Sequence, residues 1–585
     1  MLTTKKLNTD LCVIGGGLAG ICAAISAARE GISVVLVHER PVLGGNSSSE
    51  IRMWVCGAHG EDNKETGIIE EIMLENLYRN PTKNHFLWDK ILYDFINREK
   101  NITLLLNCTC MDADYTLGDY KNNRDRKINS IKAYQMTTQC FFEINASFFA
   151  DCSGDSILAP LTGAEFRIGR ESADEFGEDV STKTPDLMTM GSSCLLQGRE
   201  THKEVPFKAS EFAFPINDNH VKNRPMDIYN PSENFWYLEL GGDRDTIEDA
   251  EEIRADLIPL AEGVWDYIKN SGKYDSKNWE LEFLGFLPGK RESRRMVGEY
   301  IITQTDISEG KRYPDTVAYG GWPLDDHFPA GYFHKGYPNT DFVTPAPYPL
   351  PYRALYSKNV ENLFFAGRNI SMTHGAMSSI RVMATCGLLG QAVGSAAAVA
   401  TKYNTTPQGV YENHISELQE ILLNADCFLP HFKRKISKNC PEDILSNGAD
   451  RKHRLYKNEN NFCRKLKNNE EIIYKLNGKI SSVHIVFDSD LNRETLPGDN
   501  CERHHGTRAN IRLDSPVMHM PKTLCKSFTL TGIKNGEKIV ILKNDTNIKR
   551  CYHVENLKGY SEISLTVHEN WGNTDTTNII SFDYN

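Results

Sequence analysis

The order of apolar and polar residues predicts the elements of this chain, and the pattern changes character near residue 440. Close to the start, the apolar runs 11–14 and 34–37 flank an alanine-rich stretch. Short apolar runs between turn residues are typical of buried parallel strands, so this segment predicts a strand–helix–strand unit. Residues 249–270 combine acids and apolar residues at helical spacing and predict an amphipathic helix, whereas 234–240 has the pattern of a strand.

Two more helices are predicted in the second half of the chain. One, from about Thr373 to Thr401, is rich in small residues and is interrupted by Arg381 and Gln391. These interruptions favour a helix buried beneath a sheet over a transmembrane span. The other covers 406–435, and its apolar face would comprise Ile415, Leu418, Ile421 and Leu422.

Beyond about residue 440, short alternating runs replace the helical periodicity. The clearest runs are Val483/Ile485/Phe487, Phe528/Leu530 and Ile563/Leu565/Val567. The sequence Lys534-Asn535-Gly536 is a turn signal typical of a tight hairpin. Residues 440–585 are therefore predicted to form an antiparallel β-sandwich.

A glycine motif joins the first predicted strand to the first predicted helix. Gly15 suits the tight turn, Gly17 lets a pyrophosphate approach the backbone, and Gly20 lets the helix pack on the sheet. Glu39 lies 19 residues after Gly20, where a carboxylate can accept the hydroxyls of an adenosine ribose. The N-terminus of the helix offers N–H groups to the phosphates, beginning with Leu18 and Ala19. Together these features predict a dinucleotide site rather than an ordinary glycine turn.

Four segments resemble the glutathione-reductase-type FAD superfamily. The segment 40–49 contains the Gly-Gly turn that runs under the ribityl chain and flavin ring in that superfamily, and 107–110 matches its strand beside the adenine. The segment 148–155 resembles its Ala-Thr-Gly-Asp element, with Cys-Ser in place of Ala-Thr. The segment 362–368 precedes a long helix, as in the strand and helix that close the flavin site of the family.

This resemblance implies FAD as the cofactor. One departure is Arg368, because many flavoproteins have an aspartate after the last glycine to bind the ribityl chain. The motif and the resemblance together imply the following cofactor-binding residues: Gly15, Gly17, Leu18, Ala19, Gly20, Glu39, Arg40, Gly44, Gly45, Asn46, Ser47, Cys110, Ser153, Gly154, Asp155, Gly367, Arg368 and Arg381.

Within the superfamily, the chain is most similar to bacterial FAD-dependent oxidoreductases related to heterodisulfide reductase and fumarate reductase flavoproteins. The similarity rests on residues 291–298, 366–368 and 378–383. It implies an α/β fold with a Rossmann-like FAD-binding domain, an inserted α+β substrate domain and the C-terminal β-sandwich. The predicted boundaries are 1–165 and 355–435 for the FAD domain, 166–354 for the substrate domain and 440–585 for the sandwich.

The sandwich has its own resemblance. The spacing of 483–491 and the run 571–582 resemble discoidin or galactose-binding-like modules, which often bind glycans through aromatic and acidic loop residues. The alternative is a sandwich that only braces the enzyme or its oligomer. Both alternatives stay open.

The motifs also limit the chemistry. A second glycine motif for NAD and the redox-active cysteine pair of disulfide reductases are absent from the sequence, and Cys56 is a lone thiol. A hydride exchanged between a substrate carbon and flavin N5 remains. Histidine titrates in the range that such a step needs, so His59, in the segment expected near the ring, is the first candidate base. The second is His374, with Ser371 and Thr373 as expected partners; for either, a histidine that only holds a loop is the alternative.

Arginines are the expected substrate clamps, because guanidinium suits bidentate binding of carboxylates. The candidates are Arg52, Arg294, Arg295 and Arg381, and Arg294 is also a candidate proton donor. We expect a carbohydrate or sugar acid as substrate, and the electron partner stays open. One alternative is a fumarate-reductase-like enzyme that reduces a C=C bond through the pair 294/295. The other is a glycan-binding or assembly protein with a vestigial flavin site.

Composition and charge narrow the partners. The net charge is −12 and the chain has no stripe of basic and aromatic residues, so nucleic acid is not an expected partner. Fifteen cysteines without a CxxC pair suggest a reduced set, and no signal peptide is visible, which together predict a cytoplasmic location. Asp325-Asp326-His327 is interpreted as a solvated acidic turn, and no metal site is predicted.

Overall fold

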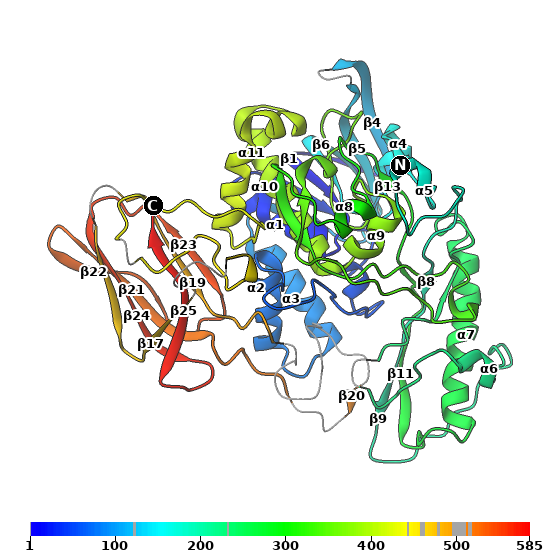
Figure 1. Ribbon diagram of the computed structural model, residues 1–585. Helices are drawn as coiled ribbons and strands as arrows, with labels where there is room; N and C mark the ends of the chain where they lie inside the picture. The colour runs from blue at the N-terminus through cyan, green and yellow to red at the C-terminus, as the bar shows by residue number, and fades with distance from the viewer. Residues whose placement is uncertain are drawn as a thin grey trace.

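A computed structural model of the chain describes residues 2–120, 124–230, 233–441, 444–456, 463–476, 480–493, 511–512 and 517–585. Figure 1 shows a central sheet with helices, a region around the long helix α7 on one side, and C-terminal β-sheets on the other. The predicted α/β class is confirmed by the parallel strands and covering helices of the central part.

The central sheet has the strand order β3-β2-β1-β6-β5-β4, and β16 also pairs with β6. Strands β1, β2, β3, β6 and β16 are parallel, whereas β4 and β5 form an antiparallel hairpin beside β6. Their bounds are Thr4–Ile14 (β1), Val34–Val37 (β2), Ile102–Leu105 (β3), Cys108–Tyr120 (β4), Arg124–Gln135 (β5), Cys140–Asp151 (β6) and Leu363–Phe365 (β16). Both predicted strands of the first unit are confirmed, and the carboxyl ends of the parallel strands meet at one edge.

Helix α1 (Leu18–Arg29) packs directly on α10 (Met383–Tyr403). Gly390 and Gly394 permit this approach, because a Cβ at these positions would lie 2.0 Å from the Ala19 oxygen and 2.2 Å from the Ala23 oxygen. Helix α10 has the length and hydropathy of a membrane span, yet 94% of that stretch is buried inside the protein. It is the buried core helix that the sequence predicts.

The helix expected over 373–401 is broken, which is a correction. Helix α9 (His374–Ile380) ends before Arg381, Val382 is extended, and α10 begins at Met383. The Ala384 N–H donates to the Cys56 carbonyl oxygen at 2.9 Å, so the break is tied to the loop after the Gly-Gly turn. The break directs Arg381 away from the helix axis and into the site described below.

The helix expected over 406–435 is also too long. Helix α11 covers Pro407–Asn424 and ends where Asp426 takes a φ of 62°. The Asp426 carboxylate pairs with Arg550 of the C-terminal sheets at 3.1 Å, so a contact between distant segments ends the helix. The remaining helices of the FAD part are α2 (Ile68–Arg79), α3 (His85–Arg98) and α4 (Leu158–Thr162).

The middle segment contains small sheets around α7 (Ala250–Asn270), which confirms the predicted amphipathic helix. The strand expected over 234–240 is mostly wrong: only β10 (Glu239–Leu240) is a strand, because Phe235 has a φ of 57° that a strand cannot adopt. The other elements are β7 (Phe166–Arg167), α5 (Ala173–Phe176), β8 (Ser192–Ser193), β9 (Leu196–Glu200), α6 (Asp218–Val221), β11 (Trp279–Leu284), β12 (Gly289–Lys290), β13 (Arg295–Met296), α8 (Gln304–Ser308), β14 (Thr316–Gly320) and β15 (Tyr348–Pro351).

The C-terminal part forms two sheets of four described strands, β17-β25-β19-β23 and β18-β24-β21-β22, around one apolar core. Their bounds are Arg464–Lys467 (β17), Glu471–Lys475 (β18), Ser482–Phe487 (β19), Cys525–Lys534 (β21), Glu537–Asn544 (β22), Cys551–Glu555 (β23), Tyr560–Asn570 (β24) and Thr576–Tyr584 (β25). The described strands of both sheets pair antiparallel with their neighbours, so the predicted sandwich is confirmed. The predicted hairpin joins β21 to β22, with Asn535 and Gly536 at φ values of 54° and 81°.

Besides the Asp426–Arg550 pair, the described part of the sandwich contacts the rest of the molecule through apolar residues and through a strand. Leu74 and Leu77 of α2 belong to its apolar core. The short strand β20 (Ile511–Arg512), which lies between β19 and β21 in the sequence, pairs in parallel with β9 of the middle segment. Figure 1 shows β20 beside β9, far from the other C-terminal strands.

Candidate active site

The loop between β1 and α1 has the conformation that its glycines predict. Gly15 has a φ of 109°, and a Cβ there would lie 2.3 Å from the Cys152 carbonyl oxygen. A Cβ on Gly20 would lie 1.8 Å from the Gly15 carbonyl oxygen. Backbone atoms of the fold itself therefore exclude a side chain at either position.

Space remains where a pyrophosphate would approach the N-terminus of α1. A Cβ on Gly17 would meet nothing closer than the Gly45 Cα at 3.9 Å, and Gly17 supplies no side chain to cap the helix. Gly44 and Gly367, with φ values of 110° and 117°, lie in the turns that face this end of the helix. Gly367 is close to Ala19, since its Cβ would lie 3.6 Å from that of Ala19. These residues fit a dinucleotide phosphate bound by the helix N-terminus.

The other predicted cofactor residues of this part differ in their surroundings. The Glu39 side chain, after β2, is 49% exposed and lies 3.5 Å from Arg40 Nε, so it is accessible to a ribose. Ser47 is buried and its hydroxyl donates to the Gly44 carbonyl oxygen at 2.8 Å, which braces the glycine turn. Cys110 is buried in β4, and burial raises the pKa of its thiol to about 12, so it is a neutral packing residue.

The turn after β6 is held by hydrogen bonds to the Asp151 carboxylate. The Ser153 hydroxyl donates to the Asp151 carboxylate at 2.7 Å, and this carboxylate also accepts from the Asn369 amide at 3.2 Å. A Cβ on Gly154 would lie 3.0 Å from Arg368 Nε. The absence of a side chain at Gly154 therefore leaves room for the Arg368 side chain.

Arg368, where many flavoproteins have an aspartate, forms an ion pair with Asp155. The Asp155 carboxylate lies 2.7 Å from Arg368 Nη2 and 2.8 Å from Lys290 Nζ, and it accepts from the Ser293 hydroxyl at 2.7 Å. Although burial opposes it, the two cations hold the pKa of Asp155 below its usual range. One carboxylate thus fixes two cationic side chains side by side.

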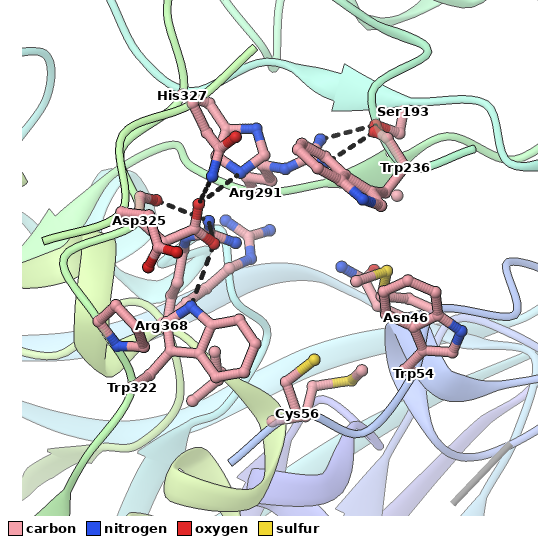
Figure 2. Close-up of a pocket in the computed structure, with 18 of the residues that line it drawn as sticks. Asn46, Trp54, Cys56, Ser193, Trp236, Arg291, Trp322, Asp325, His327 and Arg368 are labelled. Atoms are coloured by element: carbon pink, nitrogen blue, oxygen red, sulfur yellow. Dashed lines mark hydrogen bonds and ion pairs between the residues drawn. The ribbon is translucent and has the colours of Figure 1, made fainter. Parts of the chain in front are cut away.

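These two cations lie on the wall of a cavity of about 670 Å³ between the FAD part and the middle segment. Figure 2 shows Trp236 and His327 on one side of the space and Trp322 and Cys56 on the other. The described residues of its wall include three tryptophans, four cationic side chains and two carboxylates. They are Trp54, Trp236, Trp322, Lys290, Arg291, Arg368, Arg381, Asp325 and Asp341.

A chain of ion pairs and hydrogen bonds orders one wall of the cavity. Glu239 Oε2 lies 2.6 Å from His327 Nδ1 and 3.3 Å from Arg291 Nη1. Asp325 Oδ2 accepts from Arg381 Nη2 and Trp322 Nε1, both at 3.1 Å. The interpretation of 325–327 as a solvated turn is therefore wrong: His327 is 3% exposed, and the described residues contain no group able to hold a metal ion.

The structure separates the predicted histidines. His59 lines the cavity and packs against Trp322, with ring centroids 4.6 Å apart. His374 lies behind the described wall, and its partners are Glu292 at 2.9 Å and Asp326 at 3.0 Å instead of Ser371 and Thr373. Although burial opposes it, the two carboxylates raise the pKa of His374 to about 10. A histidine that stays protonated at neutral pH is unsuited to act as a base.

The predicted arginine pair is also placed away from the cavity. Arg294 lies over the Phe166 ring at 5.7 Å, and Arg295 is buried with Glu171 at 2.8 Å and with Glu292. Neither is among the described residues of the wall. Arg52 is engaged elsewhere as well, with Gln197 at 3.0 Å and Glu282 at 3.3 Å. Of the four arginines expected to clamp a substrate, only Arg381 faces the space.

The ion pairs of His374 predict a pH dependence of folding stability. Because the folded protein holds this proton more tightly than the unfolded chain, the stabilisation is complete below about pH 6.5, the ordinary pKa of histidine. It is lost as the pH rises toward about 10, where folded His374 deprotonates. Thermal unfolding between pH 6 and about pH 10 should therefore show a falling melting temperature, and the fall should be shallower in H374Q. If the melting temperature fell equally with pH in the wild type and in H374Q, the pH dependence could not be assigned to His374.

The glycines at the N-terminus of α1, next to a charged cavity, are the arrangement of an enzyme that binds a dinucleotide cofactor. The sequence profile of the FAD dependent oxidoreductase family matches residues 10–422. The chain therefore belongs to this family: it is an FAD-dependent oxidoreductase, and FAD is its cofactor.

Individual relatives are distant. Glycerol-3-phosphate dehydrogenase 2 of Mycobacterium tuberculosis is 36% identical over 74 residues, which span 12% of this chain and 13% of the relative. Quinol fumarate reductase FrdA of E. coli is 12% identical over 72% of this chain and 75% of its own, with a TM-score of 0.27. A geranylgeranyl bacteriochlorophyll reductase-like protein of Thermoplasma acidophilum is 13% identical over 72% and 88%, with a TM-score of 0.29.

Several cavity residues have no clear signal in the sequence. Arg291 belongs to a segment that carries the family similarity, but the sequence pattern there favours its neighbour Arg294. Trp236, Trp322 and Lys290 belong to no motif. His327 has a partial signal, because it stands next to two aspartates, but its partner Glu239 lies 88 residues away.

Proposed function

We propose that this enzyme oxidises a hydroxyl group of a small anionic polyol, with sugar acids as the substrate class. The observation that supports it most is the charge of the cavity wall: four cationic side chains face two carboxylates among the described residues. Asp155 and Glu239, which pair with Lys290, Arg368 and Arg291, lie outside the described lining of the cavity, so the donors of these pairs rather than their carboxylates face the space. Guanidinium groups placed in this way suit bidentate binding of an anionic substrate.

Arg381 is the side chain best placed to bind the substrate carboxylate. Its Nη2 is bonded to Asp325, and its side chain is 12% exposed on the cavity wall. A guanidinium has five N–H donors, so donors remain for a carboxylate ligand. Arg368 and Lys290 share Asp155 and add positive charge nearby.

The remaining wall suits the carbon skeleton of a sugar. Trp236 and Trp322 offer flat apolar faces, and Asn339 offers an amide that already donates to Asp325 at 2.6 Å. The tryptophans also exclude water from the reacting carbon. FAD, when bound, takes up the hydride that leaves this carbon. Glycerol 3-phosphate, the substrate in the name of the mycobacterial relative, is likewise a small anionic alcohol.

The alternatives have less support. The fumarate-reductase-like reaction depends on Arg294 and Arg295, which lie away from the cavity. A vestigial flavin site does not agree with membership of an oxidoreductase family. For the sandwich, the contact of Leu74 and Leu77 with its core favours a bracing role over glycan binding.

Anaerobic titration of the oxidised holoenzyme with sugar acids and with the corresponding neutral sugars tests this function. We expect sugar acids to bleach the flavin absorption and neutral sugars to bleach it poorly. Bleaching by neutral sugars alone would refute the anionic substrate. Absence of bleaching by any hydroxy acid would refute the function itself.

Substitution of Arg381 tests the clamp. A charge-assisted hydrogen bond contributes about 1.5–3 kcal/mol, so R381M should raise the dissociation constant of a sugar acid about 10- to 100-fold. R381K keeps the positive charge but loses the planar guanidinium that binds a carboxylate with two hydrogen bonds. Its dissociation constant for the sugar acid should therefore lie between those of the wild type and R381M. Binding of the neutral sugar serves as the control and should change little. An equal loss for acid and sugar would show that Arg381 supports the shape of the cavity rather than the charge of the ligand.

A further inference from the structure

His327 has the surroundings of an acid–base residue. It lies on the cavity wall, its side chain is 3% exposed, and its ring packs edge-on against Trp236 at 5.2 Å. Its Nδ1 is 2.6 Å from Glu239 Oε2. The other oxygen, Oε1, accepts from the Gly191 N–H at 2.7 Å, which fixes the carboxylate on the side away from the histidine.

The position of the proton on His327 follows from these contacts. Although burial opposes it, Arg291 and His327 lower the pKa of Glu239 to about 2, so Glu239 is a carboxylate and can only accept. Nδ1 must therefore carry a hydrogen and donate it. In the neutral ring, Nε2 is then the acceptor.

Nε2 is also the nitrogen that is not firmly bonded. Its nearest partner among the described residues, Asp325 Oδ1, lies at 3.4 Å, beyond the usual range of N–H···O bonds. That carboxylate already accepts from Asn339, Trp322 and Arg381. A substrate hydroxyl that enters beside Arg381 can therefore take the place next to Nε2.

We propose that His327 Nε2 is the base that removes the hydroxyl proton of the substrate, and that Glu239 positions its ring. This assignment rests on the proposed function. The substrate O–H bond would break with its proton passing to Nε2, while FAD, when bound in its oxidised form, would accept the hydride of the C–H bond. The electron pair of the former O–H bond completes a C=O bond, so an alcohol becomes a ketone and one flavin gains two electrons. The arrangement of carboxylate, histidine and reacting hydroxyl follows the general logic of an oriented base.

The two other histidines of the region differ from His327. His374 is bound on both nitrogens by carboxylates and lies behind the described wall. His59 faces the cavity, where its ring packs on Trp322. His59 and His327 are therefore the pair that an experiment must distinguish.

The pH profile of kcat/KM should report the environment of His327. The reaction needs a neutral Nε2, so kcat/KM should fall at low pH, which gives the profile an acidic limb. The charged and titratable groups that face it from the surrounding elements are Glu239, Asp325, Asp326, Arg291 and Arg381. E239Q removes one negative charge that stabilises the imidazolium, so the acidic limb should move to lower pH. E239D keeps the charge and should restore the limb toward the wild-type position.

The decisive measurement is the anaerobic rate of flavin reduction by a sugar acid in the holoenzyme. General base catalysis contributes about 10²- to 10⁴-fold, so H327Q should be slower by this factor, with binding of the sugar acid nearly unchanged. H59Q should lose far less, and H202Q, at an exposed site, should match the wild type. The flavin spectrum and melting temperature of each variant establish that it is folded.

Each outcome decides the assignment. Rapid reduction in H327Q, or a larger loss in H59Q, would overturn it while leaving the proposed function intact. An acidic limb that stays in place in E239Q would overturn the positioning role of Glu239. A wild-type flavin that no hydroxy acid reduces would overturn the proposed function and the role of His327 with it.

Discussion

G20A should abolish FAD binding and destabilise the protein. A Cβ on Gly20 would lie 1.8 Å from the Gly15 carbonyl oxygen and 3.0 Å from its carbon. Both are backbone atoms of the residue that follows β1, so the clash can be relieved only if α1 moves away from β1. That movement separates the N–H groups of the helix from the turn that holds the phosphates. We expect apoprotein without flavin absorption and a melting temperature lower than that of the wild-type apoprotein.

G17A is the matched control. Its Cβ would meet nothing closer than Gly45 Cα at 3.9 Å, and the φ of −70° at Gly17 suits alanine. The apoprotein should therefore be as stable as the wild type. A bound pyrophosphate would occupy this space, and overpacking of about 1–3 kcal/mol predicts a 5- to 100-fold weaker affinity for FAD, to order of magnitude. Unchanged FAD affinity in G17A would refute the proposed place of the phosphates, and a stable G20A that binds FAD would refute the packing argument.

The contrast between these glycines shows why the FAD part could be predicted from sequence. Gly15, Gly17, Gly20 and Glu39 lie within one strand–helix–strand unit, so their spatial relation follows from local geometry. The hairpin at Asn535 is local for the same reason. Each of these predictions needs only the short-range rules for turns and strands.

The break between α9 and α10 has no such local signal. Arg381 and Val382 are ordinary helix residues, and neither glycine nor proline occurs at the break. The cause is tertiary: the Ala384 N–H bonds to Cys56, and Arg381 bonds to Asp325. Since these partners come from distant segments, the sequence pattern favours one continuous helix.

The arrangement of the cavity wall could be predicted from the sequence even less well than the helix break. Glu239 begins strand β10 and His327 lies in the segment after β14, so their relation appears only when these two parts of the chain are brought together. The sequence favours His59, in the segment after the Gly-Gly turn, and then His374, at a helix start. In the structure, carboxylates surround His374, whereas His59 and His327 both line the cavity.

R295M should destabilise the protein by about 3–5 kcal/mol, because it leaves buried carboxylates without their cation. The Arg295 side chain is fully buried and pairs with Glu292 and with Glu171 at 2.8 Å. It also donates to the carbonyl oxygens of Gly169 at 2.7 Å and Met372 at 3.1 Å. The buried groups left behind have no access to water, so the cost cannot be screened. Chemical denaturation of the holoenzyme at neutral pH measures this loss in the free energy of unfolding.

R199M is the matched control, since the Arg199 side chain is 38% exposed and pairs with the half-exposed Glu280. Exposed pairs contribute at most about 1 kcal/mol, so this variant should unfold close to the wild-type midpoint. The double substitution E292Q/R295M should recover part of the loss, because it removes one stranded charge together with the cation. If R295M and R199M proved equally mild, the cluster around Arg295 would be solvated in solution. The part of the cavity wall at Arg291, four residues before Arg295, would then lack the rigid support that the proposed chemistry requires.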